Sequence, residues 1–179
     1  MTHTEVLTFW FEQCKPKDWW QKNHDFDVMI QQRFGLLQQA ASQGELFQWR
    51  ECAEGRLAEV IVLDQFSRNI FRDQPAAFAC DSMALALSQE AIRQGADSDL
   101  TEQQRLFLYM PFMHSESKLI HEQAMHLFEQ LGLESNLEFE RKHKAIIDRF
   151  GRYPHRNDIL GRRSSAEELA FLKQPGSSF

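Results

Sequence analysis

Two oppositely charged side chains, Asp64 and Arg68, lie one helical turn apart in the segment 53–71. In a helix of about 3.6 residues per turn they share a stripe with Leu57 and Ile61, so both are predicted to point into the core. An unpaired buried charge is costly, so each is expected to have a partner. The pair is interpreted either as a structural clamp or as part of a polar pocket. The strip of this segment that is predicted to face water comprises Glu54, Gln65, Asn69 and Arg72.

Two histidines also fall on predicted apolar helix faces. His143 shares a face with Phe139 and Ile146, and His114 follows Phe107 along another face. Histidine titrates near neutral pH and can act as a general acid or base. The alternative is that each histidine is a hydrogen-bonded core residue without a chemical role, which is the commoner case for a lone inward histidine.

A possible zinc motif begins at His121 and ends at His126. In the HExxH motif the second histidine follows four residues after the first, whereas here it follows five residues after, about 140° around the helix. The two imidazoles therefore cannot share one zinc ion on a regular helix. A metal held by His114 and His143 with carboxylates is the weaker alternative. We predict no metal and no cofactor.

Composition and charge limit the class of partner. The chain has 179 residues with 42% hydrophobic and 12% aromatic residues, which is typical of a globular domain. Its formal net charge of -6 argues against nucleic acid as a partner. The longest apolar run is too short to span a membrane, and the first residues lack the pattern of a signal peptide. No membrane partner is predicted.

The three cysteines are Cys14, Cys52 and Cys80. Their odd number and wide spacing predict neither a disulfide framework nor a zinc knuckle, which favours a reducing, cytoplasmic location. None of them has a histidine nearby in the sequence, so no cysteine nucleophile is predicted.

A basic segment lies near the end of the chain. Five arginines and one acidic residue occur between positions 149 and 163; the arginines are Arg149, Arg152, Arg156, Arg162 and Arg163. Pro154 stiffens the segment, and Gly151 and Gly161 permit tight turns. We predict a structured basic loop over residues 150–163. It is interpreted either as a strap that folds back on acidic groups or as an anion site, since guanidinium groups bind phosphate and carboxylate well.

Helix signals fill the rest of the chain. Helices are predicted at about 2–13, 25–42, 53–71, 75–94, 101–111, 119–131, 136–150 and from 164 or 165 onward. Their expected starts include Thr2 with Glu5, Pro75, Thr101 with Gln104, and Ser135 with Glu138. We therefore predict one all-α domain over 1–179, with seven to eight helices in stacked antiparallel pairs and a short final helix.

Four sequence blocks carry a resemblance to a known family. They are FWF at 9–11, LDQFSRNIFR at 63–72, PFMHSE at 111–116 and FGRYPHRNDILGRRSSAEE at 150–168. In this order they resemble the bacterial family of domain of unknown function number 924. The resemblance implies a fold similar to tetratricopeptide-repeat proteins, without a true repeat consensus, and implies no established activity. The family's characteristic residues map onto Asp64, Gln65, Arg68, Asn69, Arg72, His114, Glu116, His143, Arg152, His155, Arg156 and Asn157.

Three functions are compatible with this pattern. The first is a binding module for a small anionic ligand or an acidic peptide, with the candidate residues Asp64, Arg68, Asn69, His114, Glu116, His143, Arg152, His155, Arg156 and Asn157. The second is a hydrolase or transferase that acts on an anionic substrate, with His143, His114 and Asp64 as catalytic candidates. The third is a scaffold in which these polar groups only hold helices together. The sequence does not indicate an oligomeric state.

Overall fold

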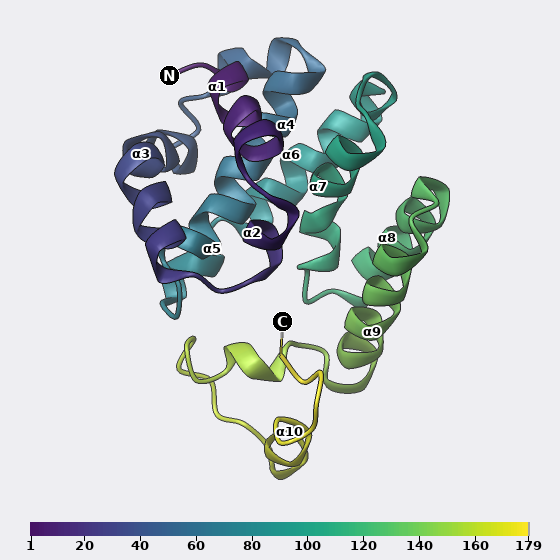
Figure 1. Ribbon diagram of the computed structural model, residues 1–179. Coiled ribbons are helices and arrows are strands. Elements are labelled where there is room, and N and C mark those ends of the chain that lie inside the picture. The colour runs from purple at the N-terminus through teal and green to yellow at the C-terminus, as the bar shows by residue number, and fades with distance from the viewer. Residues whose placement is uncertain (179) are drawn as a thin grey trace. The chain divides into compact units, whose positions relative to one another are not determined.

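The structure is a computed structural model that describes residues 1–178. Figure 1 shows helices joined by turns and loops, and no strand occurs among the described residues. The predicted all-α class is therefore confirmed. None of the described helices is both long enough and apolar enough to cross a membrane.

The chain divides into two compact units, which we describe one at a time. The first unit comprises Met1–Arg72 with Ala76–Pro111, and the second comprises Asp73–Pro75 with Phe112–Phe179. The single domain over 1–179 and the tetratricopeptide-repeat-like superhelix stay predictions.

The first unit holds the helices from α1 to most of α7. These are α1 (His3–Thr8), α2 (Pro16–Trp20), α3 (His24–Ser42), α4 (Ala53–Ile61), α5 (Ser67–Ile70), α6 (Asp81–Arg93) and α7 (Glu102–Met113). A π-helical segment, Phe9–Gln13, continues α1, and another, Val62–Phe66, joins α4 to α5. Short 3-10 helices lie at Phe47–Glu51 and Ala96–Asp99, and a third, Pro75–Phe78, belongs to this unit from Ala76 onward. The long helix that the sequence predicts at 53–71 is thus one helical run with a π-helical centre.

Aromatic side chains form the centre of the first unit. Phe66 of the second π-helical segment packs on Phe34 of α3 and on Trp10, with ring centroids 4.7 and 5.5 Å apart. Trp10 also meets Phe107 of α7 edge-on at 5.5 Å. None of these four side chains is more than 1% exposed. The aromatic core therefore holds the segment Val62–Phe66, and with it Asp64, firmly in place.

Three of the predicted helix starts are confirmed as capping boxes, and one of them is the start of the final helix, at Ser165 with Glu168. The hydroxyl of Thr2 accepts a hydrogen bond from the Glu5 N–H, and the Glu5 carboxylate accepts one from the Thr2 N–H. Thr101 and Gln104 repeat this arrangement at the start of α7. Each box satisfies backbone N–H groups that would otherwise have no partner within the helix.

Two other predicted starts are wrong. Pro75 opens a 3-10 turn and α6 begins only at Asp81, because the fixed φ of proline suits either kind of helix. The helix α9 begins at Glu134 rather than beyond Ser135, and Leu133 takes the N-cap position. Gly132 ends α8 in the left-handed conformation, with a φ of 77°, and α9 begins two residues later.

The second unit is built on a helical hairpin. Its elements are α8 (Lys118–Leu131), α9 (Glu134–Phe150), a 3-10 turn (Pro154–Arg156) and α10 (Ala166–Phe171). Gly151 ends α9 with a φ of 69°, and the chain then runs through residues 151–165, which we call the C-terminal strap. Tyr153 of this strap packs with Ile146 and Ile147 of α9 as the core of the unit.

Candidate functional site

Asp64 lies at the centre of a polar cluster in the first unit. It is fully buried, and its Oδ1 lies 3.0 Å from Nη1 of Arg68. The amide of Gln65 donates to its other carboxylate oxygen at 2.6 Å. The guanidinium of Arg68 also donates to both carboxylate oxygens of Asp81 on α6, at 2.9 and 3.0 Å. Asp64 and Arg68 therefore tie the central helical run to α6, as the clamp interpretation requires.

Asn69 and Arg72 contact a different carboxylate of the first unit, that of Asp27 on α3. Asn69 donates from Nδ2 at 2.8 Å, and Arg72 donates from Nε and Nη2 at 2.5 and 2.7 Å. The prediction that Gln65 faces water is wrong, since Gln65 is 6% exposed. A π-helical turn contains more residues than an α-helical turn, so it shifts the faces that a 100° periodicity assigns.

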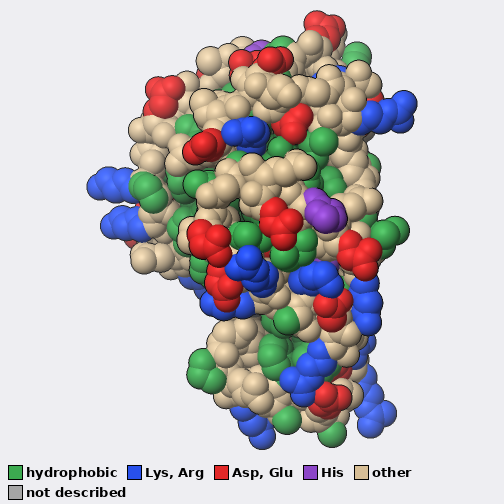
Figure 2. Space-filling view, turned by 90° about the vertical axis from the view of Figure 1, so that its right-hand side faces the viewer, with side chains coloured by type: hydrophobic (Ala, Val, Ile, Leu, Met, Phe, Trp, Pro, Cys, Tyr) green, Lys and Arg blue, Asp and Glu red, His purple; other side chains and the backbone are tan. Residues whose placement is uncertain are grey.

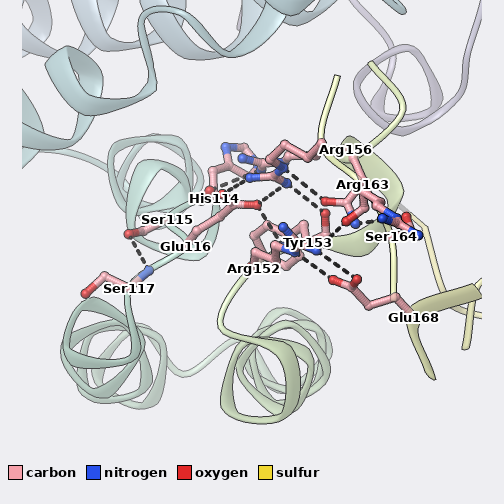
Figure 3. A network of polar contacts seen from close by, with 12 residues as sticks. His114, Ser115, Glu116, Ser117, Arg152, Tyr153, Arg156, Arg163, Ser164 and Glu168 are labelled. Carbon is pink, nitrogen blue, oxygen red and sulfur yellow. Dashed lines mark hydrogen bonds and ion pairs between the residues drawn. The ribbon is translucent and has the colours of Figure 1, made fainter. Parts of the chain in front are cut away.

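In the second unit, arginines of the C-terminal strap are bound to carboxylates (Figure 3). Arg152 donates from Nε and Nη2 to the two carboxylate oxygens of Glu168, at 2.7 and 2.8 Å. Arg162 donates from Nη1 and Nη2 to those of Glu116, at 2.6 and 2.9 Å. Such bidentate pairs are the geometry that a guanidinium group favours. The pairs tie the strap to α10 and to the loop between α7 and α8.

Both carboxyl groups are held in their ionised form. Hydrogen bonding from Arg152 is the main cause that lowers the pKa of Glu168 to about 2, although burial opposes this shift. Burial raises the pKa of Glu116, but the donors on Arg162 and the backbone N–H of Tyr153 outweigh it, so this pKa lies below its ordinary value. The strap interpretation of the basic segment thus agrees with both the geometry and the electrostatics.

A buried network that the sequence reasoning missed centres on His121 and Glu140, both 0% exposed. Nδ1 of His121 lies 2.7 Å from Oε1 of Glu140, and its Nε2 lies 2.8 Å from the carbonyl oxygen of Ser115. The Tyr153 hydroxyl donates to the carbonyl of Met113 at 2.6 Å, so its oxygen can accept from Nε2 of His121 at 3.2 Å. Burial raises the pKa of Glu140, although His121 opposes this shift.

His143 points inward, as predicted, and is 7% exposed. Its Nδ1 donates to the carbonyl of Phe139 at 2.7 Å, and its ring meets the ring of Tyr153 edge-on at 5.7 Å. Burial is the main cause that lowers the pKa of His143 to about 3, and the neighbouring histidines add to it. Phe139 does not share the buried face as predicted, because its side chain is 50% exposed.

Arg156 and Asn157 are also buried within the second unit, at 6% and 1% exposed. The guanidinium of Arg156 stacks over the Tyr153 ring, 4.6 Å from its centroid, and donates to the carbonyl of His114 at 3.1 Å. Asn157 accepts from Nε of Arg162 at 3.0 Å and donates to the hydroxyl of Ser164 at 3.1 Å. These contacts hold the strap in one conformation.

A hollow of about 480 Å³ opens beside the strap in the second unit. It is lined by Pro154, His155, Asp158, Arg162, Ser164, Leu169 and Leu172. Figure 2 shows acidic and basic side chains interspersed on the face in view, rather than one broad basic surface. The lining of the hollow itself combines one arginine, one histidine and one aspartate with a serine and three apolar residues.

The predicted site residues fall into the two units. Asp64, Arg68 and Asn69 lie in the first unit, and the second contains His114, Glu116, His143, Arg152, His155, Arg156 and Asn157. Within residues 1–178, no group of three or more His, Cys, Asp or Glu side chains is arranged to hold a metal ion.

The described residues form an all-α protein in which buried polar contacts join several of the helices. A family model described as "Bacterial protein of unknown function (DUF924)" matches residues 6–176, so the chain belongs to this family. A solved structure of a protein of unknown function from Agrobacterium tumefaciens is similar, with 38% identity, a TM-score of 0.91 and 96% of each chain covered. The comparison with curated proteins gave no match. The resemblance drawn from the four sequence blocks is confirmed.

Proposed function

We propose that the chain is a helical binding module that takes a small anionic ligand in the hollow beside the C-terminal strap. The observation that carries this proposal is the lining of the hollow. The lining residues include Arg162, His155 and Ser164, which carry polar groups, one acidic residue, Asp158, and the apolar residues Leu169 and Leu172. A few polar groups among apolar ones, in a volume of a few hundred Å³, are typical of a small-molecule site.

Arg162 offers the main polar contact for a ligand. Its contacts with Asn157, Glu116 and the carbonyl of Tyr153 use four of its five N–H groups, which leaves one Nη1 hydrogen for an anion. The hydroxyl of Ser164 accepts from Asn157 and can still donate its own hydrogen. Because Glu116 balances the charge of Arg162, the ligand is held by directed hydrogen bonds more than by net charge.

The ligand should also carry an apolar part. Three apolar residues line the hollow: Leu172, which is half-buried, Leu169, which is 53% exposed, and Pro154 of the strap. A carboxylate or phosphate ester with a short apolar group would satisfy both kinds of lining. Arg152 and Arg156, predicted as binding residues, would contribute indirectly, because their known contacts are with Glu168, Tyr153 and His114.

The enzymatic alternative, with His143, His114 and Asp64 as catalytic groups, gains no support from these contacts. A histidine with a pKa of about 3 is neutral at pH 7 but is a weak base, far from the matched pKa that general catalysis favours. Scaffolding alone is the third alternative. The three cysteines are free thiols, which suits the cytoplasmic location that we propose.

Calorimetric titration with a panel of small anions tests the proposal. The panel contains inorganic phosphate, short-chain carboxylates and simple phosphate monoesters. Leu169→Glu places a negative charge at the exposed edge of the hollow and should weaken binding at least about tenfold, since like charges repel in a partly desolvated site. Leu119→Glu is the matched control, because Leu119 is 63% exposed on α8 and does not line the hollow.

The expected result is one class of anion that binds the parent chain and Leu119→Glu equally and binds Leu169→Glu more weakly. If no anion of the panel binds, or if Leu169→Glu binds as well as the parent, the hollow is not an anion site and the scaffold alternative is favoured.

A further inference from the structure

The first unit contains a thiol–imidazole pair that the proposed function does not use. Sγ of Cys52 lies 3.9 Å from Nε2 of His3, although the two residues are 49 positions apart in the sequence. Cys52 is exposed, whereas Cys14 and Cys80 are buried. Burial raises the pKa of Cys14 to about 12 and also raises that of Cys80, so neither is suited to form a thiolate.

The backbone around Cys52 holds the thiol in place. Cys52 is the N-cap residue of α4, and its Sγ also lies 3.9 Å from the carbonyl oxygen of Trp49. A methyl group on Gly55 would overlap the carbonyl oxygen of Trp49, so this turn packs directly against the first turn of α4. His3 meets the Trp49 ring edge-on at 6.0 Å, which orients the imidazole beside the thiol.

A hollow of about 360 Å³ adjoins the imidazole. His3 lines it together with Leu7, Phe11, Glu12 and Glu54. Glu54 lies two residues beyond Cys52 in the sequence, and both Glu12 and Glu54 are exposed. The hollow can therefore admit a small molecule beside the imidazole of His3, the neighbour of the thiol, and its carboxylates favour one with positive charge.

We propose that Cys52 and His3 form a thiol–disulfide exchange site for small cationic disulfides. Nε2 of His3 accepts the thiol proton, and the resulting thiolate attacks one sulfur of the disulfide. The S–S bond of the small molecule breaks as the new S–S bond to Cys52 forms. The leaving thiolate takes a proton, so the products are a mixed disulfide on Cys52 and one free thiol, with no further oxidant.

Modification kinetics of the whole chain test this inference. The probes are cystamine, a dicationic disulfide, and dithiodiglycolate, a dianionic disulfide of similar size. The adduct is followed by intact mass and located by peptide mapping. His3→Gln should slow modification by cystamine about tenfold or more near pH 7, since the base is lost. His24→Gln is the matched control, because His24 is an exposed histidine that starts another helix of the same unit.

Two further comparisons separate proton transfer from simple access. At about pH 10 an exposed thiol ionises without a base, so His3→Gln and the parent should react at the same rate. Cys52→Ser should form no adduct, and cystamine should react faster than dithiodiglycolate. Equal rates of the parent and His3→Gln near pH 7, or an adduct on Cys14 or Cys80, would overturn the pair; faster reaction with the dianion would overturn the preference for cations.

Discussion

At the scale of single residues, Tyr153 makes several different kinds of contact within the second unit. Its ring lies under the guanidinium of Arg156 and meets the imidazoles of His121 and His143 edge-on. Its hydroxyl donates to the carbonyl of Met113, and the side chain is 0% exposed. One aromatic ring therefore joins the strap to the start of the second unit and to both helices of the hairpin.

Tyr153→Phe keeps the ring contacts and removes only the hydroxyl. We expect the variant to lose about 1–2 kcal/mol of unfolding free energy, because the carbonyl of Met113 loses a buried donor, whereas Nε2 of His121 keeps its contact with the carbonyl oxygen of Ser115. Urea unfolding measures this loss. Tyr109→Phe is an informative comparison, since that hydroxyl donates to Asp97 in the first unit and its loss should leave the strap intact. Unchanged stability of Tyr153→Phe would mean that the hydroxyl contributes nothing net to the fold.

The sequence predicts burial best for residues whose position depends only on the periodicity of their own helix. Periodicity alone places Asp64 and His143 inside, and both are buried. The pairs His121–Glu140 and His3–Cys52 are invisible to periodicity, because each joins residues on different helices. Glu140 shares the buried face of α9 with Leu137, His143 and Ile147, so its spacing could have placed it inside, but the spacing does not reveal His121 as its partner.

At the scale of elements, the join between the Phe47–Glu51 turn and α4 depends on one position without a side chain. Gly55 lies in α4 against the backbone of Trp49, and an added methyl group would overlap that carbonyl oxygen. The sequence predicts the helix here but not this contact, since glycine inside a helix normally only lowers helix stability. The same holds for the π-helical segment Val62–Phe66, which no local sequence signal marks.

The pair of substitutions Gly55→Ala and Gly35→Ala tests whether the contact between Gly55 and the backbone of Trp49 matters for stability. Both glycines lie within α-helices, but a methyl group at Gly35 would meet nothing within 4 Å. Gly35→Ala should therefore stabilise the chain by about 0.5–1 kcal/mol through helix propensity. Gly55→Ala should destabilise it by about 1–3 kcal/mol, because the backbone of the turn must move. Chemical denaturation gives both values, and stabilisation by both substitutions would show that Trp49 is not held against α4.

At the scale of the whole molecule, buried titratable groups make stability depend on pH. The pKa of His143 is about 3 when folded and near 6.5 when exposed, so between these values the unfolded chain binds the extra proton. Stability therefore falls as the pH decreases from about 6.5 toward 3. Glu168, with a folded pKa of about 2, contributes stability above its ordinary pKa that is lost as the pH falls toward 2. Between pH 7 and 5, the titration of His143 therefore changes the stability of the fold, whereas that of Glu168 does not.

Because the two groups titrate in different pH ranges, the contribution of His143 to stability can be measured separately. By linkage, His143 should cost about 2 kcal/mol of stability between pH 7 and 5. His143→Asn can keep a donor near the carbonyl of Phe139 but cannot titrate, so it should lose that much less on acidification. Glu140 acts with the opposite sign, because its pKa is raised, but it is present in both chains and cancels in the comparison.

His126→Asn is the control, since its side chain is 79% exposed and should titrate alike in both states. Equal acid sensitivity of the parent, His143→Asn and His126→Asn in urea unfolding would show that His143 takes up its proton in the folded chain. That result would restore His143 as a candidate acid–base group and would bring the enzymatic alternative back ahead of the scaffold.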